Sequence, residues 1–238
     1  MTYRATFTIS LLALALGGLA GCTGAQEPSA HTVAQSDPGD VKRAAKRAED
    51  ARELIAKGKL DKAVERAEEA VAMNRAHASY RALLGQAYLL SGRFVSARDA
   101  LTDSLTLDPA DGKAALNLTL AQIALGNNAG ARATLARHSD GIAPADRGLA
   151  LALAGEPAAA VSVLQEAARG TGATPKLRQN LALALALAGE WKDAQTVAAV
   201  DLPPAEVRTR IMQWAEFARP THAHDLSLIH ISEPTRPY

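Results

Sequence analysis

The clearest pattern of apolar and polar positions lies in residues 78–111, where apolar side chains recur every three or four residues on both sides of a central break. This spacing predicts two amphipathic helices, and Ser91-Gly92 in the break predicts a tight turn between them. Asp108-Pro109 predicts the end of the second helix, because proline has no amide hydrogen and disfavours a helical residue before it. The unit is therefore expected to be a helix, a turn and a second helix.

Side-chain size along this unit predicts how its two helices pack. Gly85 and Ala97 are small residues at which the helices are expected to approach closely. Tyr88 and Leu101 are large and are expected to fill the space between them.

The unit repeats along the chain. Its turn glycine recurs at separations of 34, 34, 29 and 34 residues, at Gly58, Gly92, Gly126, Gly155 and Gly189. An alanine follows each of these glycines by five residues, at Ala63, Ala97, Ala131, Ala160 and Ala194. A small residue precedes each by seven, at Ala51, Gly85, Thr119, Gly148 and Ala182. The helix pairs are therefore expected to share one packing pattern.

With this period and pattern, residues 44–200 resemble the tetratricopeptide repeat family, whose period is 34 residues. The resemblance implies an all-α fold, a tetratricopeptide-repeat α-solenoid of about five helix-turn-helix repeats plus a C-terminal capping helix. A generic alanine-rich helical bundle is the alternative. In the short repeat around Gly155, Pro144 and Pro157 stand where first helical turns would begin, so the missing residues are expected to come from the connection before it.

The N-terminus has the pattern of an export signal. Arg4 precedes an apolar run at residues 9–20 that is too short for a transmembrane helix. The following Leu19-Ala20-Gly21-Cys22 resembles the lipobox of bacterial lipoproteins, which implies that Cys22 is lipidated. An ordinary signal peptide with an incidental cysteine is the alternative. The resemblance, with threonine rather than aspartate at position 23, implies an outer-membrane lipoprotein that faces the periplasm.

Composition divides the chain into further segments. Residues 1–21 are expected to be the signal peptide, residues 22–40 a disordered tether poor in large apolar side chains, and residues 41–202 the solenoid. Residues 203–219 carry one apolar stripe and are expected to form the capping helix. Residues 220–238 are expected to be a disordered tail, of which residues 226–238 resemble a translated sequencing adapter and are excluded from the fold.

Charge and motifs give no indication of catalysis or of nucleic-acid binding. The formal net charge is only +1, and acids match bases in the charged first repeat, so no basic nucleic-acid site is expected. The sequence has no glycine-rich phosphate loop, nucleophile elbow or zinc-protease motif. His222 and His224 could bind a metal, but no third ligand is evident nearby. We therefore predict a protein that is not an enzyme and has no cofactor, metal or small-molecule substrate.

The expected working surface is the concave groove that the first helix of each repeat lines in this family. Resemblance to the family places eleven residues there: Ser79, Ala82, Gln86, Leu89, Lys113, Leu116, Leu120, Ile123, Lys176, Gln179 and Leu183. Because this set is mostly apolar, an apolar peptide segment or helix of an envelope protein is the expected partner.

An exported lipoprotein with about five such repeats also resembles the TadD-type lipoproteins of Flp (tight-adherence) pilus assembly. This resemblance implies a membrane-anchored periplasmic scaffold in pilus or secretion-system assembly. The alternative is a peptidoglycan-linked envelope factor whose C-terminal SPOR-like domain is truncated. An enzyme whose catalytic domain is missing is a third alternative.

Overall fold

The structure is a computed structural model that describes residues 38–170 and 173–218. These residues form helices and connections without a strand, which confirms the predicted all-α fold. The predicted signal peptide, Cys22 and most of the tether lie outside the described residues, as do His222, His224 and the adapter-like tail. None of the described helices is both long enough and apolar enough to span a bilayer.

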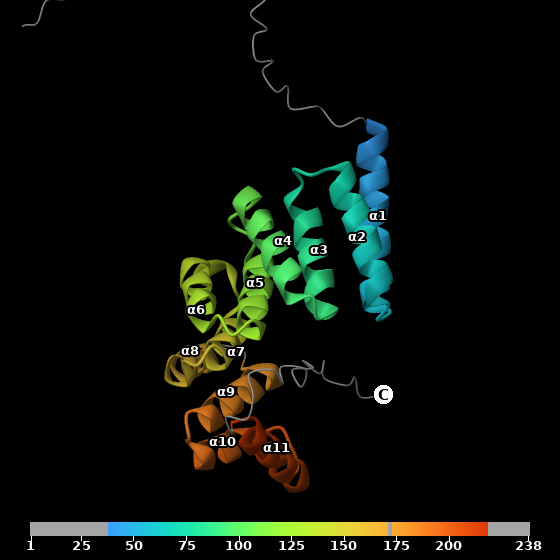
Figure 1. The fold of residues 1–238 in the computed structure, drawn as a ribbon. Coiled ribbons are helices and arrows are strands. Elements are labelled where there is room, and N and C mark those ends of the chain that lie inside the picture. Colours follow the sequence, from blue (N-terminus) through green and yellow to red (C-terminus); the bar gives the residue numbers. More distant parts are fainter. Residues whose placement is uncertain (1–37, 171–172, 219–238) are drawn as a thin grey trace, which may run out of the picture. The chain divides into compact units, whose positions relative to one another are not determined.

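The helices form five consecutive pairs followed by one more helix (Figure 1). The pairs are α1 (Pro38–Ala56) with α2 (Leu60–Met73), α3 (Ala78–Leu90) with α4 (Phe94–Leu107), α5 (Gly112–Ala124) with α6 (Asn128–Arg137), α7 (Pro144–Leu153) with α8 (Pro157–Arg169), and α9 (Pro175–Leu187) with α10 (Trp191–Ala198). A short 3-10 helix, η1 (Ser139–Gly141), lies between α6 and α7, and α11 (Pro204–Phe217) follows the last pair. We call the two members of each pair its first and second helix.

The turn inside each pair explains why its glycine recurs. In the second pair Gly92 has a φ of 75°, a left-handed conformation that a side chain disfavours. The amide of Gly92 donates to the carbonyl of Leu89 at 3.1 Å, and that of Arg93 donates to Tyr88 at 2.8 Å. Together these bonds satisfy the carbonyls at the end of the first helix. The other four turn glycines also have positive φ, and the bond from the residue after the glycine recurs, from Lys59, Asn127, Glu156 and Glu190 to Leu54, Gln122, Leu151 and Leu185.

The small residue seven positions before each turn glycine faces the second helix of its own pair. A Cβ on Gly85 would lie 2.4 Å from Leu101 Cγ, and one on Gly148 would lie 2.4 Å from Leu164 Cγ. Gly85 therefore makes room for Leu101, whereas the sequence suggested that it paired with Ala97 to bring the helices together. In the remaining pairs the equivalent residues are Ala51 with Ala67, Thr119 with Leu135, and Ala182 with Ala198.

The short repeat differs from expectation. We expected the connection before α7 to be shortened, but residues 138–143 form a longer connection than residues 108–111 do between α4 and α5. The helices are shorter instead: α6 has 10 residues against 14 in α4, and α7 has 10 against 13 in α3. Pro144 occupies the first turn of α7, where its missing amide hydrogen is tolerated, and so defines the late start of that helix.

Neighbouring pairs share a core. The second helices α2, α4 and α8 pack against the first helix that follows each of them, and α3 packs against α5, α5 against α7, and α7 against α9. The last helix, α11, packs on α9 and α10 and buries Val207 and Trp214 in the core of the final pairs. The opposite side of α11 exposes mainly polar residues, among them Glu206, Arg208 and Arg210. A polar outer face of this kind is what the last helix of a repeat array needs.

Candidate protein-interaction surface

The first helices carry a row of half-buried side chains at one repeated position. Six residues before the turn glycine stand Gln86 in α3, Leu120 in α5, Leu149 in α7 and Leu183 in α9, and each is partly exposed. These four helices pack against one another in sequence order, so the equivalent residues lie on successive neighbours. We call these four residues, together with the half-buried Leu89 of α3 and Leu116 of α5, the first-helix face.

The structure places most of the eleven expected groove residues at least partly at the surface. Ser79, Lys113 and Lys176 are at least partly exposed. Seven others are half-buried: Ala82, Gln86, Leu89, Leu116, Leu120, Gln179 and Leu183. Ala82, Leu89 and Leu116 pack against one core cluster, which brings α3 and α5 together on this face.

Ile123 departs from the expectation. It is only 6% exposed and packs with Ala131 and Ala154 in the core. The reason is its contact with Ala154 of the fourth repeat. The equivalent residues Ala152 and Ala186 are also buried, whereas Leu89 at the same position of the second repeat stays half-buried. Ile123 therefore joins the third and fourth repeats and is not available to a partner.

Leu149 was not among the expected groove residues. The expected groove included no residue of the fourth repeat, yet α7 presents Leu149 at the same distance from Gly155 as Leu183 stands from Gly189. Counting back from the turn glycine would have identified it.

Charge on the first helices of the last four pairs is sparse. Asp146 is the only acidic residue within α3, α5, α7 and α9, and its carboxylate pairs with Lys176 Nζ of α9 at 2.7 Å. Lys176 therefore contributes to the contact between two repeats as well as to the surface. The first-helix face is thus apolar, with no carboxylate of its own helices left unpaired beside it.

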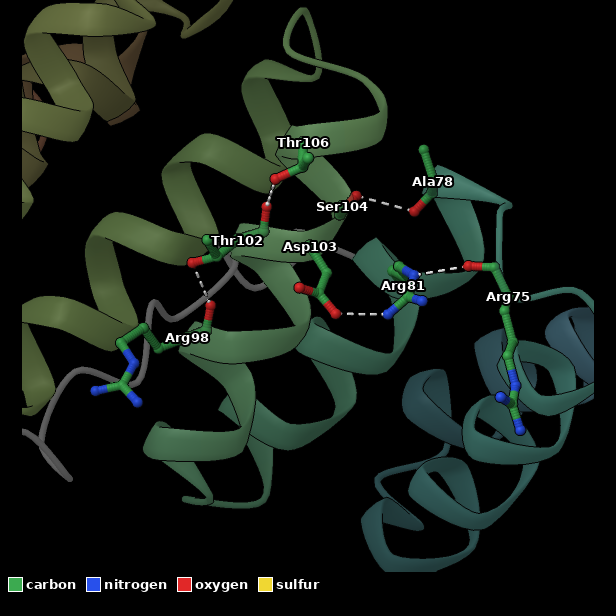
Figure 2. Close-up of polar contacts among 8 residues, drawn as sticks. All are labelled: Arg75, Ala78, Arg81, Arg98, Thr102, Asp103, Ser104 and Thr106. Atoms are coloured by element: carbon green, nitrogen blue, oxygen red, sulfur yellow. Dashed lines mark hydrogen bonds and ion pairs between the residues drawn. The ribbon is translucent and has the colours of Figure 1, made fainter. Parts of the chain in front are cut away.

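A second repeated feature, an arginine that joins the two helices of a pair, was missed by the sequence analysis. Arg81 Nη1 donates to Asp103 Oδ2 at 2.6 Å, and its Nε donates to the carbonyl of Arg75 at 2.8 Å (Figure 2). Arg47 Nε lies 2.8 Å from Glu69 Oε2, and Arg178 Nε donates to Asp201 Oδ2 at 2.9 Å. We call this arrangement the arginine clasp.

The sequence does contain a signal for the arginine clasp. Each arginine stands eleven residues before its turn glycine, and each carboxylate follows that glycine by eleven or twelve residues. In the fifth pair the hydrogen bond from Arg178 holds the pKa of Asp201 below its usual value. The carboxylate therefore stays charged, and the clasp links the start of α9 to the connection after α10.

Tyr88 makes a polar contact that stabilises the fold. Its hydroxyl donates to Glu68 Oε1 of α2 at 2.5 Å, and the guanidinium of Arg93 lies over its ring, 4.4 Å from the centroid. Burial, with the neighbouring Glu68 carboxylate, raises the pKa of Tyr88 to about 12. The phenol therefore stays protonated near neutral pH and serves as a hydrogen-bond donor between two pairs.

Other kinds of site have little support in the described residues. They contain no group of three or more histidine, cysteine, aspartate or glutamate side chains placed to hold a metal ion. Two open hollows in these residues share no lining residue with the first-helix face, one at residues 189–193 and one between α7 and α8.

Comparison with protein families gives one match, in which a tetratricopeptide repeat model covers residues 89–142. These residues run from the end of α3 to the connection before α7 and overlap the clearest sequence pattern, at residues 78–111. Comparison with the curated protein sequences finds no match.

Solved structures with a similar fold cover most of the chain. A thermophilic tetratricopeptide-repeat protein of Thermus thermophilus matches with a TM-score of 0.58 at 21% identity, over 73% of this chain and 99% of its own. Pseudomonas aeruginosa pilF matches with a TM-score of 0.57 at 14% identity, over 78% and 96%. YrrB, described as a tetratricopeptide-repeat protein with an unusual peptide-binding site, matches with a TM-score of 0.51 at 16% identity, over 70% and 90%. The predicted fold, a tetratricopeptide-repeat solenoid, is therefore confirmed.

Proposed function

We propose that the chain is a protein-binding scaffold whose first-helix face holds an apolar helix or extended segment of a partner. The observation that carries this proposal is the row of half-buried leucines, Leu120, Leu149 and Leu183, on three successive helices that pack against one another. A partner that covers these side chains removes apolar area from water without burying a charge. The described peptide-binding site of YrrB, a protein of similar fold, supports the same class of function.

Charged substitutions on this face test the proposal. We expect Leu120→Glu and Leu149→Glu each to weaken partner binding by more than about 1 kcal/mol, because a few buried anchors dominate most interfaces. Binding is measured by crosslinking and recovery of envelope partners, and folding by circular dichroism. Val200→Glu and Met212→Glu are matched controls, since both residues are highly exposed, at 65% and 72%, and lie outside the face. Folded face variants that recover the same partners as wild type would refute the proposal.

We further propose that the scaffold is anchored to the outer membrane through Cys22, on the periplasmic side. The support is the lipobox-like sequence, in which the only cysteine of the chain stands at the position that lipidation requires. Several acyl chains on one residue anchor a protein stably, because each buried methylene contributes about 0.8 kcal/mol.

Cys22→Ser is expected to release the protein from the membrane fraction. The serine hydroxyl cannot replace the thiol that receives the lipid, so the variant loses its acyl chains. Fractionation of epitope-tagged wild type and variant measures this, with Ser10→Ala in the preceding apolar run as a control for export. Equal membrane association of wild type and Cys22→Ser would exclude the lipid anchor.

Within this class, assembly of a Flp-type pilus or a secretion system is the more specific role that we propose. It rests on the combination of a lipobox-like N-terminus with about five repeats, which resembles the TadD-type lipoproteins. Loss of surface pili after deletion of the gene, restored by wild type and not by the Leu120→Glu variant, would support this role. Normal pili in the deletion strain would exclude it and leave the general scaffold function intact.

A further inference from the structure

A hollow between α7 and α8 lies apart from the first-helix face. Its volume is about 370 Å³, and it is lined by Pro144, Arg147, Ser162, Val163, Glu166 and Ala167. The first two residues belong to the start of α7 and the other four to α8. The walls therefore combine apolar surface with one guanidinium and one carboxylate.

The late start of α7 explains why the hollow exists. In the second pair the first turn of α3 lies over α4, where Ser104 Oγ donates to the carbonyl of Ala78 at 2.9 Å (Figure 2). Ala167 of α8 is equivalent to Ser104, twelve residues after its turn glycine. Because α7 begins only eleven residues before Gly155, whereas α3 begins fourteen before Gly92, the helical turn that lies over Ser104 has no counterpart over Ala167.

The arginine clasp is also incomplete at this hollow. Glu166 stands eleven residues after its turn glycine, the position that Glu69 and Asp103 occupy in their repeats. The matching arginine position, eleven residues before the glycine, holds Pro144. Glu166 instead pairs with Arg169 of its own helix at 2.8 Å, and both side chains are highly exposed, at 77% and 72%. An ion pair this exposed contributes little and is readily exchanged.

We propose that the hollow receives an arginine side chain of a partner protein, which takes the place that Arg47, Arg81 and Arg178 take within their own repeats. Its aliphatic stem lies along Pro144, Val163 and Ala167, and its guanidinium bonds to the Glu166 carboxylate. Arginine is favoured over lysine because its planar fork matches a carboxylate with two parallel hydrogen bonds. The carbonyl end of α8, where Glu166 lies, also favours a cation.

Arg147 on the opposite wall repels an arginine in the hollow, because both side chains are positively charged. Its Nη1 donates to the carbonyl of Ser139 at 3.2 Å, and its Nε is buried with no hydrogen-bond partner. An acidic side chain is therefore the competing occupant. The Nε of Arg147 is closed to a ligand and its Nη1 is already bonded to Ser139, whereas the Glu166 carboxylate is highly exposed, which favours arginine over an acid.

Titration of the purified chain with short peptides tests the proposal by nuclear magnetic resonance. We expect acetyl-Gly-Arg-Gly-amide to shift the amides of Val163, Glu166 and Ala167 saturably. The citrulline peptide, which has the same shape without the charge, is expected to bind about threefold or more weakly, the scale of one exposed ion pair. Equal affinity of the two peptides, or tighter binding of acetyl-Gly-Glu-Gly-amide, would overturn the proposal.

Two variants locate the site. Pro144→Arg restores the arginine of the clasp and is expected to fill the hollow from within. The amide shifts caused by the arginine peptide should then disappear. The substitution is compatible with the helix, since the first helical turn contains arginine in α3 and α9. Glu166→Gln, at an exposed side chain, is expected to reduce affinity as much as citrulline does. Asp103→Asn is the control, because Arg81 already occupies that clasp. If the arginine peptide binds Pro144→Arg or Glu166→Gln as tightly as wild type, the arginine binds elsewhere. These outcomes are independent of the proposed role of the first-helix face, because neither variant changes that face.

Discussion

Gly85→Ala is expected to destabilise the fold by about 1–3 kcal/mol, the usual cost of forcing extra volume into a packed interior. The added Cβ would lie 2.4 Å from Leu101 Cγ and 2.8 Å from its Cδ2. Leu101 is completely buried, so it has no route to solvent by which to move aside. Urea denaturation measures the free energy of unfolding for variant and wild type. Gly170→Ala is a suitable control, because its Cβ meets only the carbonyl of Ala167 at an ordinary 3.5 Å.

The same contact predicts a non-additive double variant. Leu101→Ala alone leaves a cavity and is expected to cost about 2–5 kcal/mol. Combining it with Gly85→Ala places alanine at both positions, as Ala51 with Ala67 and Ala182 with Ala198 already do in the first and fifth repeats. We expect the double variant to be more stable than the sum of the single effects by about 0.5–3 kcal/mol, the range for residues in direct contact. Strict additivity would show that the two residues do not share one space.

Local stereochemistry made much of this fold predictable from the sequence. A helix that ends in a left-handed residue favours glycine there, so Gly92 and its four equivalents mark the turn inside each helix pair. The small residue seven positions earlier follows from the close approach to the second helix at Leu101 or Leu164. Both signals lie within one helix pair, and therefore neither depends on how the pairs pack together.

Features that depend on contacts between pairs were harder to predict. Ile123 was assigned to the groove from the resemblance to the family, and only the packing of the fourth repeat shows that it lies against Ala154. The early end of α6 was missed because residues 137–140 contain no glycine or proline to mark it, whereas the start of α7 at Pro144 was predicted. The packing of the following connection against α5 decides where α6 ends.

The arginine clasp was missed for a different reason. Long charged side chains on amphipathic helices are usually solvated, and α3 contains no acid with which Arg81 could pair, so nothing nearby in the sequence points to its partner. The pairing with Asp103 becomes evident only when residues are counted from the turn glycine in both directions, across two helices. Leu149 of the first-helix face becomes evident by the same count.

The connection between α6 and α7 packs so closely on α5 that Gly112 has no room for a side chain. A Cβ on Gly112 would lie 1.8 Å from the carbonyl oxygen of Gly141 and 2.3 Å from its carbonyl carbon. His138 holds this connection through a 3.0 Å hydrogen bond between its Nδ1 and the carbonyl of Pro109. Ile142, which follows Gly141, is only 5% exposed and packs in the core of the second and third repeats. The clash is therefore with backbone that is held on both sides.

Gly112→Ala is accordingly expected to destabilise the protein by about 3 kcal/mol or more, at or above the upper end of the range for overpacking. The helix itself does not require glycine at this point, since the equivalent first residues of α3 and α9 are Ala78 and Pro175. Relief of the clash requires residues 138–143 to move away from α5, which exposes Ile142 and breaks the bond to Pro109. Urea denaturation measures the loss, and faster hydrogen exchange of the Gly141 amide, which donates to His138, locates it. Lys113→Ala, at the neighbouring partly exposed residue, is the control and is expected to change stability by less than about 0.5 kcal/mol. An unfolding midpoint for Gly112→Ala equal to that of the control would mean that this connection does not pack against α5 in solution.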